Sequence, residues 1–354
     1  MKKYHILKYF AILGITSAFS FSCKSPTGPG GGTTPDTTSN NFTWTTYTFG
    51  GQGGSSYFKD VAILNDTLAY AVGEINDSSP YPYCVARWNG SSWGVMRLYD
   101  IEKDYQGNKD TALVWSLDGV LAFSGNDVWL ASGAVFHWDG EDSITSLSFT
   151  PLTSSGLVAG IRHLWGSSSL NIYGVGDSGA VRQYTNGLWQ GMQSGTMIDL
   201  RDVWGSSDGS TVWACGWSND DNQSILLEYD GTSWKTMWTR VGLSSVPPYE
   251  FFTTSVWGID SLVVSTGRGV SDDTTQVATL PSFPYRIRGD AANDIVVVGD
   301  GGMIWHYNGA NWTQLNTQPN ATFYSVAISK TMIVAVGIDN SIGFGAGLIA
   351  VGKR

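Results

Sequence analysis

A unit of about 44 residues repeats along most of this chain, and it constrains the fold more than any other feature. The clearest copy spans residues 200–237 and reads LRDVWGSSDGSTVWACG, then SILLEYDG, then SWKTM. Residues 161–192 repeat it as IRHLWGSSSLNIYGVG, AVRQYTNG and LWQGM, and residues 285–315 and 57–96 carry two further copies. Each copy consists of short apolar runs separated by turn residues, a pattern typical of β-strands joined by tight turns.

One glycine ends the second apolar run of each unit. It recurs seven times, at Gly73, Gly133, Gly176, Gly216, Gly267, Gly299 and Gly337. The first and last of these glycines are 264 residues apart, so the six steps between them average 44 residues. Because a four-stranded propeller blade takes about 40–45 residues, the spacing predicts an all-β, seven-bladed β-propeller over residues 42–354.

Hairpin signals join the third and fourth runs of most units. An Asn or Asp followed by Gly favours a tight turn because Gly adopts a positive φ at little cost. These dipeptides stand at Asn89-Gly90, Asp139-Gly140, Asn186-Gly187, Asp230-Gly231 and Asn308-Gly309. A tryptophan restarts the chain shortly after four of them, at Trp93, Trp189, Trp234 and Trp312.

The two ends of the repeat region complement each other. The last unit stops at Arg354 without its tryptophan run, whereas an unpaired run, FTWTTYTF with Trp44, precedes the first unit. We therefore expect residues 42–49 to form the outer strand of the last blade, which removes an open edge from the ring.

Two units depart from the pattern. The second has no tryptophan after Asp139-Gly140 and follows an insertion near LYDIEKDYQGNKDTALVW. The fifth, from TTSVWGIDSLVVSTGRG to TLPSF, lacks both the turn dipeptide and the tryptophan. A six-bladed ring, or a ring with one irregular blade, therefore stays open as an alternative.

The N-terminus has the pattern of a secretion signal. Residues 1–22 combine a basic start with an uncharged apolar run that is too short to span a bilayer. The segment resembles a bacterial lipoprotein signal, which implies that Cys23 is lipidated; the alternative is an ordinary signal peptide that leaves Cys23 as a free thiol. Residues 24–41 are rich in Gly, Pro, Ser and Thr, so we expect residues 23–41 to be a lipid-anchored, disordered tether.

The repeat pattern VWGSS, VWxxG, YDG and Trp resembles the Trp-rich propeller repeats of many secreted bacterial proteins, over about residues 42–352. This resemblance implies a propeller fold and is nearly silent on activity. The lipoprotein-like signal leads us to expect an outer-membrane lipoprotein on the periplasmic or cell-surface side. We expect a monomer. The formal net charge of -10 disfavours nucleic acid as a partner because phosphates repel an acidic chain.

Charged residues gather where the first strands of the blades would line the central channel. Aligning those strands places Lys59, Arg162 and Arg201 at one position, and Asp60, His163, Asp202 and Arg286 at the next. One interpretation is a locally positive channel mouth that accepts a carboxylate, a phosphate or an acidic glycan. The other is that these charges pair between blades and only hold the ring together.

Loops supply two further candidates. The segments SSPYPYC and VPPYEFF place Tyr81, Tyr83, Tyr249 and Phe251 between strands, where exposed aromatic rings suit a sugar or a protein partner. The acidic loops 218–224 and 270–275 could hold Ca²⁺, but they show no regular ligand spacing. We expect no cofactor otherwise.

Residues that would support catalysis are scarce. Cys84 and Cys215 fall in distant blades, so we expect two buried thiols and no disulfide, and no zinc-ligand spacing is present. His137 and His306 occupy equivalent strand positions, which indicates a structural repeat. The sequence therefore favours a membrane-tethered binding or scaffold protein whose ligand is a glycan, an anion or a protein; the alternatives are a glycan-acting hydrolase or lyase and an outer-membrane assembly factor.

Overall fold

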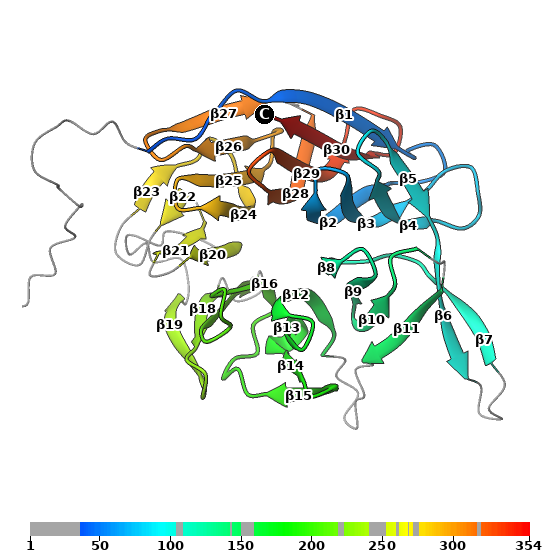
Figure 1. Ribbon diagram of the computed structural model, residues 1–354, viewed down its shortest axis with the longest axis horizontal. Helices are drawn as coiled ribbons and strands as arrows, with labels where there is room; N and C mark the ends of the chain where they lie inside the picture. The colour runs from blue at the N-terminus through cyan, green and yellow to red at the C-terminus, as the bar shows by residue number, and fades with distance from the viewer. Residues whose placement is uncertain are drawn as a thin grey trace, which may run out of the picture. The chain divides into compact units, whose positions relative to one another are not determined.

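The computed structural model describes residues 36–103, 109–141, 144–149, 159–218, 223–240, 253–259, 262–267, 269–271, 276–316 and 320–354. The strands of these residues form seven sheets, and each sheet is one blade of a β-propeller (Figure 1). Within this part of the chain, the helical structure is limited to one short 3-10 turn, η1 (Asp177–Gly179).

We number the blades along the chain. Blade one is β2 (Tyr57–Asn65), β3 (Leu68–Ile75), β4 (Tyr83–Trp88) and β5 (Trp93–Met96). Blade two is β8 (Gly119–Ser124), β9 (Asp127–Ser132), β10 (Ala134–Trp138) and β11 (Ile144–Phe149), extended by β6 (Leu98–Lys103) and β7 (Lys109–Val114). Blade three is β12 (Ile161–Ser168), β13 (Asn171–Gly176), β14 (Val181–Thr185) and β15 (Leu188–Met192).

The remaining blades follow the same order. Blade four is β16 (Leu200–Gly205), β17 (Val212–Ser218), β18 (Gln223–Tyr229) and β19 (Trp234–Arg240). Blade five is β20 (Ser255–Ile259), β21 (Leu262–Thr266), β22 (Gly269–Ser271) and β23 (Gln276–Thr279). Blade six is β24 (Pro284–Ala291), β25 (Asp294–Gly299), β26 (Ile304–Tyr307) and β27 (Trp312–Asn316), and blade seven is β28 (Ala321–Ile328), β29 (Met332–Asp339), β30 (Ala346–Lys353) and β1 (Thr43–Phe49).

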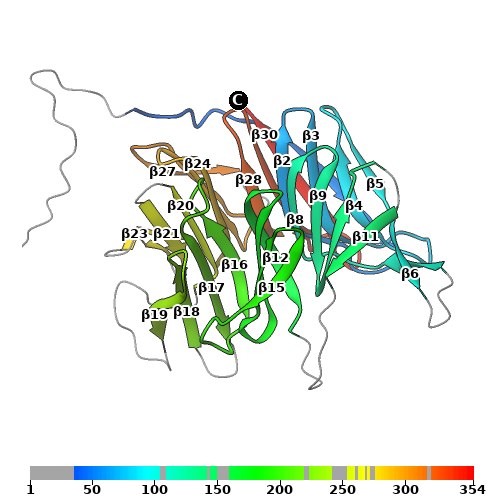
Figure 2. The same cartoon turned by 60° about the horizontal axis from the view of Figure 1, so that its bottom comes forward.

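The first strands of the blades form a closed ring around the channel. Each contacts the first strand of the next blade, and β28 of the last blade contacts β2 of the first (Figure 2). Apolar side chains fill the space between neighbouring blades, and the large rings of Trp88, Trp138 and Trp257 are almost completely buried there. Such rings bury about 150–250 Å² each, so they supply much of the packing between blades.

The first and last strands of the chain close the ring, as predicted. β1 runs antiparallel to β30 over its whole length, from Thr43 opposite Lys353 to Phe49 opposite Gly347 (Figure 1). Gly352 lies under the ring of Trp44, where an added Cβ would come within 2.9 Å of the indole. The seven-bladed ring with an N-terminal closing strand is therefore confirmed.

Both irregular units form complete blades, which removes the six-bladed alternative. Blade five has four short strands although it lacks the turn dipeptide and the tryptophan. The insertion before the second unit is the β6–β7 hairpin, and β6 pairs in parallel with β11 through Ile144 and Thr145. The insertion thus extends blade two at its outer edge.

Residues 36–41 lie against blade six, although the sequence had placed them in the tether. The Thr38 amide donates to the carbonyl of Asn308 (3.0 Å), and its hydroxyl donates to the carbonyl of Asn293 (2.9 Å). The polar composition of residues 36–41 predicted disorder. Composition does not reveal hydrogen bonds to distant parts of the chain, such as those of Thr38. Residues 36–41 belong to the same compact unit as the propeller, Asp36–Arg354.

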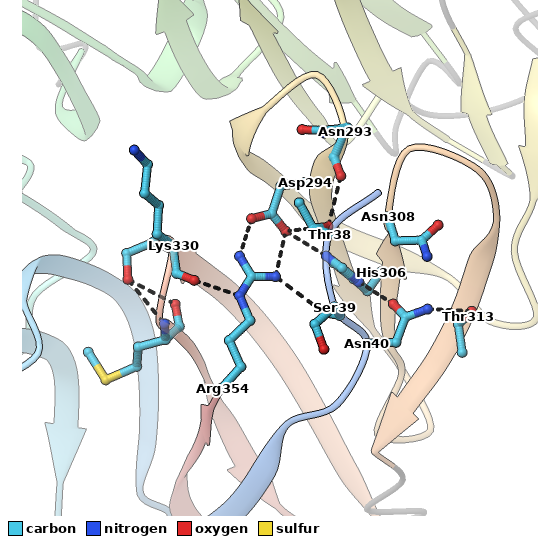
Figure 3. A network of polar contacts seen from close by, with 12 residues as sticks. Thr38, Ser39, Asn40, Asn293, Asp294, His306, Asn308, Thr313, Lys330 and Arg354 are labelled. Atoms are coloured by element: carbon cyan, nitrogen blue, oxygen red, sulfur yellow. Dashed lines mark hydrogen bonds and ion pairs between the residues drawn. The ribbon is translucent and has the colours of Figure 1, made fainter. Parts of the chain in front are cut away.

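A buried carboxylate joins this segment to the C-terminus (Figure 3). Asp294 accepts hydrogen bonds from both terminal nitrogens of Arg354 and lies 2.6 Å from Nε2 of His306. The other ring nitrogen of His306 lies 2.5 Å from Oδ1 of Asn40. Burial alone would raise the pKa of Asp294, but His306 and Arg354 outweigh it, so the pKa is lowered.

The two ends of the ring carry different loops. On the turn face lie the loops between the first and second strands and between the third and fourth strands, including Asn89-Gly90 and Asn308-Gly309. The glycines of the five hairpin dipeptides all have a positive φ, as expected. On the cup face lie the second-to-third-strand loops and the segments that lead into each first strand. Residues 36–41 contact loops of the turn face, at Asn293 and Asn308.

Candidate functional site

An extra residue in the first strand of five blades projects into the channel mouth on the cup face. In blade one the strand register jumps from Phe58 opposite Gly73 to Asp60 opposite Val72, which leaves Lys59 as a bulge. Equivalent register shifts expose Arg162, Arg201, Tyr285 and Tyr324.

The repeat glycine of the second strand makes this bulge possible. A Cβ on Gly216 would lie 2.0 Å from the carbonyl oxygen of Asp199, and one on Gly73 would lie 2.1 Å from that of Tyr57. Only glycine tolerates such a close approach of two backbones. In the five blades with the bulge, the glycine that marks the unit in the sequence therefore also shapes the site.

One residue from every blade contributes to the resulting ring of side chains. Its members, which we call the cup ring, are Lys59, Asp118, Arg162, Arg201, Thr254, Tyr285 and Tyr324. They surround a cavity of about 500 Å³, the cup. Its wall is completed by Tyr57, His163, Asp177, Asp199, Leu200, Trp217 and Arg286.

Most of the positive charge in the cup is paired. The carboxylate of Asp118 bonds to Lys59 on one side and to Nη1 of Arg162 (2.7 Å) on the other. Arg162 also holds Asp177 through Nη2 (2.8 Å) and Nε (3.1 Å). Burial alone would raise the pKa of Asp118, but Lys59 and Arg162 outweigh it, so the pKa is lowered. Because Asp118 and Asp177 neutralise these two cations, the mouth is nearly balanced in charge and not simply positive.

Arg201 is the least committed cation among those of the cup ring. Its guanidinium stacks 4.5 Å from the ring centre of Trp217, its Nε donates a long hydrogen bond to the Trp217 carbonyl (3.4 Å), and its contact with Asp199 is also long, 3.8 Å. The side chain keeps 43% of its exposure. An exposed ion pair of this length contributes little to stability, so Arg201 can exchange it for a ligand at little cost.

Tyrosine hydroxyls line the opposite side of the cup. Tyr285 and Tyr324 meet edge to face with ring centres 5.4 Å apart. Burial raises the pKa of Tyr285 to about 12 and that of Tyr324 in the same direction, so both phenols stay protonated at neutral pH. Each can therefore donate and accept a hydrogen bond.

A buried belt of charges forms the floor of the cup. Asp202 accepts hydrogen bonds from Arg286, from both terminal nitrogens of Arg288 (2.9 and 2.7 Å) and from Ser255. Arg286 in turn donates to Nδ1 of His163 (3.2 Å). Burial and the nearby Arg286 lower the pKa of His163 to about 4, so the ring is neutral at pH 7.

The belt also ties successive blades together. Side chains at one repeat position accept a hydrogen bond from a backbone N–H of the next blade: Asp60 from Val120 (3.0 Å) and Asp202 from Val256 (3.1 Å). Below it lies a second cavity of about 220 Å³ whose lining is mainly aliphatic. The belt thus separates a polar cup from an apolar shaft.

The structure brings together five of the six channel candidates in the cup lining: Lys59, Arg162, His163, Arg201 and Arg286. The sixth, Asp202, is 1% exposed and belongs to the belt. Of the two interpretations offered by the sequence, pairing between blades is correct for Asp202 and Arg286, which form an ion pair. The cup-ring residues Lys59 and Arg162 also pair between blades, but they remain part of an open wall.

The aromatic loop candidates fall in different places. Tyr81 is exposed, whereas Tyr83 is half-buried with the guanidinium of Arg97 over its ring at 3.7 Å. Tyr249 and Phe251 lie outside the described residues.

Sequence reasoning missed the carboxylates of the cup and its tyrosines. Asp118 stands at the cup-ring position of blade two, but the irregular second unit hid the alignment. Asp177 begins the 3-10 turn η1 and Asp199 precedes β16, so both lie outside the aligned strands. Tyr285 and Tyr324 stand at the aligned position in the sequence. They were missed because only charged residues were considered at that position.

The remaining chemistry is structural. Cys84 and Cys215 are buried free thiols, as predicted, and burial raises the pKa of Cys84 to about 12. His137 and His306 do repeat, since each contacts the aspartate that begins the second strand of its blade. In the described part of the chain no three acidic, His or Cys side chains gather as a metal site, and residues 219–222 and 272–275 of the acidic loops fall outside it. No helix of that part has the length and apolar character needed to span a bilayer.

Comparison with known proteins places the fold but no family. No protein-family model and no curated protein matches the chain. A solved structure titled YCF48 bound to D1 peptide superposes with a TM-score of 0.58 at 14% identity, covering 88% of this chain and 97% of that one. The WD40 propeller domain of Doa1 gives 0.57 at 14% identity (87% and 95%), and YCF48 from Cyanidioschyzon merolae gives 0.56 at 13% (88% and 98%). At these identities the chain is similar to propeller proteins in fold alone.

Proposed function

We propose that this protein is a binding or scaffold module that takes a short segment of a partner protein into the cup. The observation that carries the proposal is the cup itself, a cavity of about 500 Å³ to which every blade contributes a side chain. A rigid ring that displays variable side chains at one mouth is well suited to recognition.

The chemistry of the cup favours a polypeptide over a bare anion. Asp118, Asp177 and Asp199 already balance most of its positive charge, while Tyr285 and Tyr324 offer hydroxyls that both donate and accept. A peptide backbone presents both kinds of hydrogen-bonding group. One propeller of similar fold, YCF48, has been solved with a peptide bound, which adds support at the level of the fold.

The same electrostatics favour binding over glycan hydrolysis. A hydrolase of the common kind needs a carboxylic acid whose pKa is raised, so that it can protonate the leaving group. Asp118 is instead held ionised by Lys59 and Arg162, and Asp177 is engaged by a two-pronged guanidinium contact. These carboxylates orient cations, a role that suits a binding surface.

An array experiment tests the proposal. The full chain in detergent is probed on random dodecapeptides and, in parallel, on glycans. We expect peptides to bind and Arg201→Ala to weaken them at least tenfold, because Arg201 is the cation most available to a ligand. Lys330→Ala, which removes an exposed lysine from the turn face, serves as the matched control. Peptide binding that Arg201→Ala leaves unchanged, or binding of glycans alone, would contradict the proposal.

We further propose that the module is anchored to the outer membrane through a lipidated Cys23. The support comes from the sequence, namely the signal-like residues 1–22 and the Gly/Pro/Ser/Thr-rich segment after Cys23. Metabolic labelling with a palmitate analogue tests it: the wild-type chain should carry the label, and Cys23→Ser should lose both the label and the membrane fraction. Equal labelling of the two chains would refute it.

A further inference from the structure

Large apolar side chains are exposed in loops of the cup face. Five of those in the described residues lie in loops of the cup face: Tyr81, Trp115, Met197, Ile342 and Phe344. Only two, Leu170 and Leu188, lie at the turn face. Phe344 keeps 74% of its exposure and Trp115 keeps 56%, so these groups are not edges of the core.

Two of these residues form a preordered aromatic pair. The rings of Tyr81 and Trp115 meet edge to face with centres 6.3 Å apart. Arg97 fixes the loop beneath them, because its Nη2 donates to the carbonyl of Tyr81 (2.7 Å) and to the hydroxyl of Ser79 (2.9 Å). Arg97 is itself stacked on Tyr83. The pair is thus held in place before any ligand arrives, which lowers the entropic cost of binding.

The composition of the face points to a protein and not to a sugar. Aromatic rings alone suit either ligand, but Met197 and Ile342 add flexible and aliphatic side chains to the same end of the ring. Such side chains match apolar groups on a protein surface, and methionine adapts readily to a partner of irregular shape. Tryptophan and tyrosine often supply most of the binding energy there.

Residues 36–41 lie at the turn face, away from the exposed apolar side chains of the cup face. Thr38 and Asn40 are bonded to blade six at the turn face, on Asn308 and Thr313. Residues 38–40 thus lie at the end of the ring opposite the cup.

We propose that the rim pair, Tyr81 and Trp115, binds apolar side chains of the same partner protein whose segment enters the cup. This inference rests on the proposed function and extends it: the cup recognises a polar segment, and the rim pair adds an apolar contact beside it. The partner is thus a polypeptide that carries a polar segment and, close to it, exposed aliphatic or aromatic side chains.

Binding of a selected peptide tests the inference. A dodecapeptide is selected from a random display library against the full wild-type chain in detergent, and its affinity is measured by calorimetry. We expect the double variant Tyr81→Ser/Trp115→Ser to bind it at least tenfold more weakly. The matched control, Leu170→Ser/Leu188→Ser, removes two even more exposed apolar side chains from the other end of the ring and should bind as the wild type does. Thermal melting of each variant checks that the ring is intact.

The Arg201→Ala variant separates this inference from the proposed function. If the peptide is lost with Arg201→Ala but bound fully by the rim double variant, the rim inference falls and the cup stands. If neither variant changes the affinity, both fall. Binding of array glycans that depends on Tyr81 and Trp115, with no peptide selected, would overturn the inference in favour of a sugar platform.

Discussion

Asp202 in the first strand of blade four and Arg286 in the first strand of blade six form a buried ion pair inside the channel, although 84 residues separate them in the sequence. Blade five contributes Ser255 to the same carboxylate. Side chains of three consecutive blades thus meet at one carboxylate. The floor of the cup therefore also holds these blades together.

Removing that carboxylate should destabilise the protein strongly. We expect Asp202→Ala to lower the free energy of unfolding by about 3–5 kcal/mol, because it leaves the buried Arg286 without its counter-charge. The double variant Asp202→Asn/Arg286→Gln should lose less than the sum of its single variants, since the pair is then removed together. Urea unfolding measures both; strictly additive losses would show that the pair is not coupled.

Acid should weaken the protein through His163. The pKa of this histidine is lowered to about 4 in the folded state from about 6.5 when unfolded, so folding favours the neutral ring. Its contribution to stability is complete above pH 6.5 and is lost as the pH falls from 6.5 to about 4. In His163→Gln the urea midpoint should therefore fall less between pH 7 and pH 4 than it does in the wild type. Parallel curves for the two proteins across that range would rule out this role.

The bulge glycines should not accept a side chain. We expect Gly216→Ala to cost about 3 kcal/mol, because its Cβ would lie 2.0 Å from a backbone oxygen that cannot move freely. Gly94→Ala is the matched control, since nothing lies within 4 Å of the added methyl group; it should be neutral or stabilising by about 0.5 kcal/mol. Equal thermal midpoints for the two variants would contradict the geometric reason given for the repeat glycine.

The carboxylate at the chain ends should govern the order of the N-terminal strand. Arg354→Ala leaves Asp294 with His306 and Thr38, and we expect it to cost about 2 kcal/mol, the value of a hydrogen bond to a charged group. Hydrogen exchange in residues 43–49 should quicken. Lys330→Ala keeps the backbone carbonyl that accepts from Arg354, so it should leave exchange unchanged. Unaltered protection of β1 in the Arg354 variant would mean that strand pairing alone holds the end.

Much of the fold could be predicted from the sequence because the repeat reports the same local geometry many times. Five of the seven glycines mark a close backbone approach in their blades, and the run around Trp44 matched the strand that the last unit lacked. Even so, the docking of Thr38 on blade six could not be foreseen, since its polar surroundings in the sequence are those of a disordered tether.

The site was predicted only in part, for a physical reason. Alignment of strands places residues such as Arg162 and Arg201 at the channel, but it does not reveal the charges that reach them from outside the aligned strands, such as Asp177 and Asp199. A positive mouth was therefore expected where the folded chain has a balanced one. Pairing across blades depends on distances between residues far apart in the chain, and these are set only when the ring closes.

The seam between β1 and β30 has a mechanical consequence. Any pull on the N-terminal segment is transmitted first to the bonds of Thr38 and Asn40 and then to the strand that pairs with β30. Load applied from this end therefore falls on the one blade whose strands come from both ends of the chain. Once the bonds of Thr38 and Asn40 are broken, β1 would separate from β30. Blade seven would then open while the other six blades kept their structure.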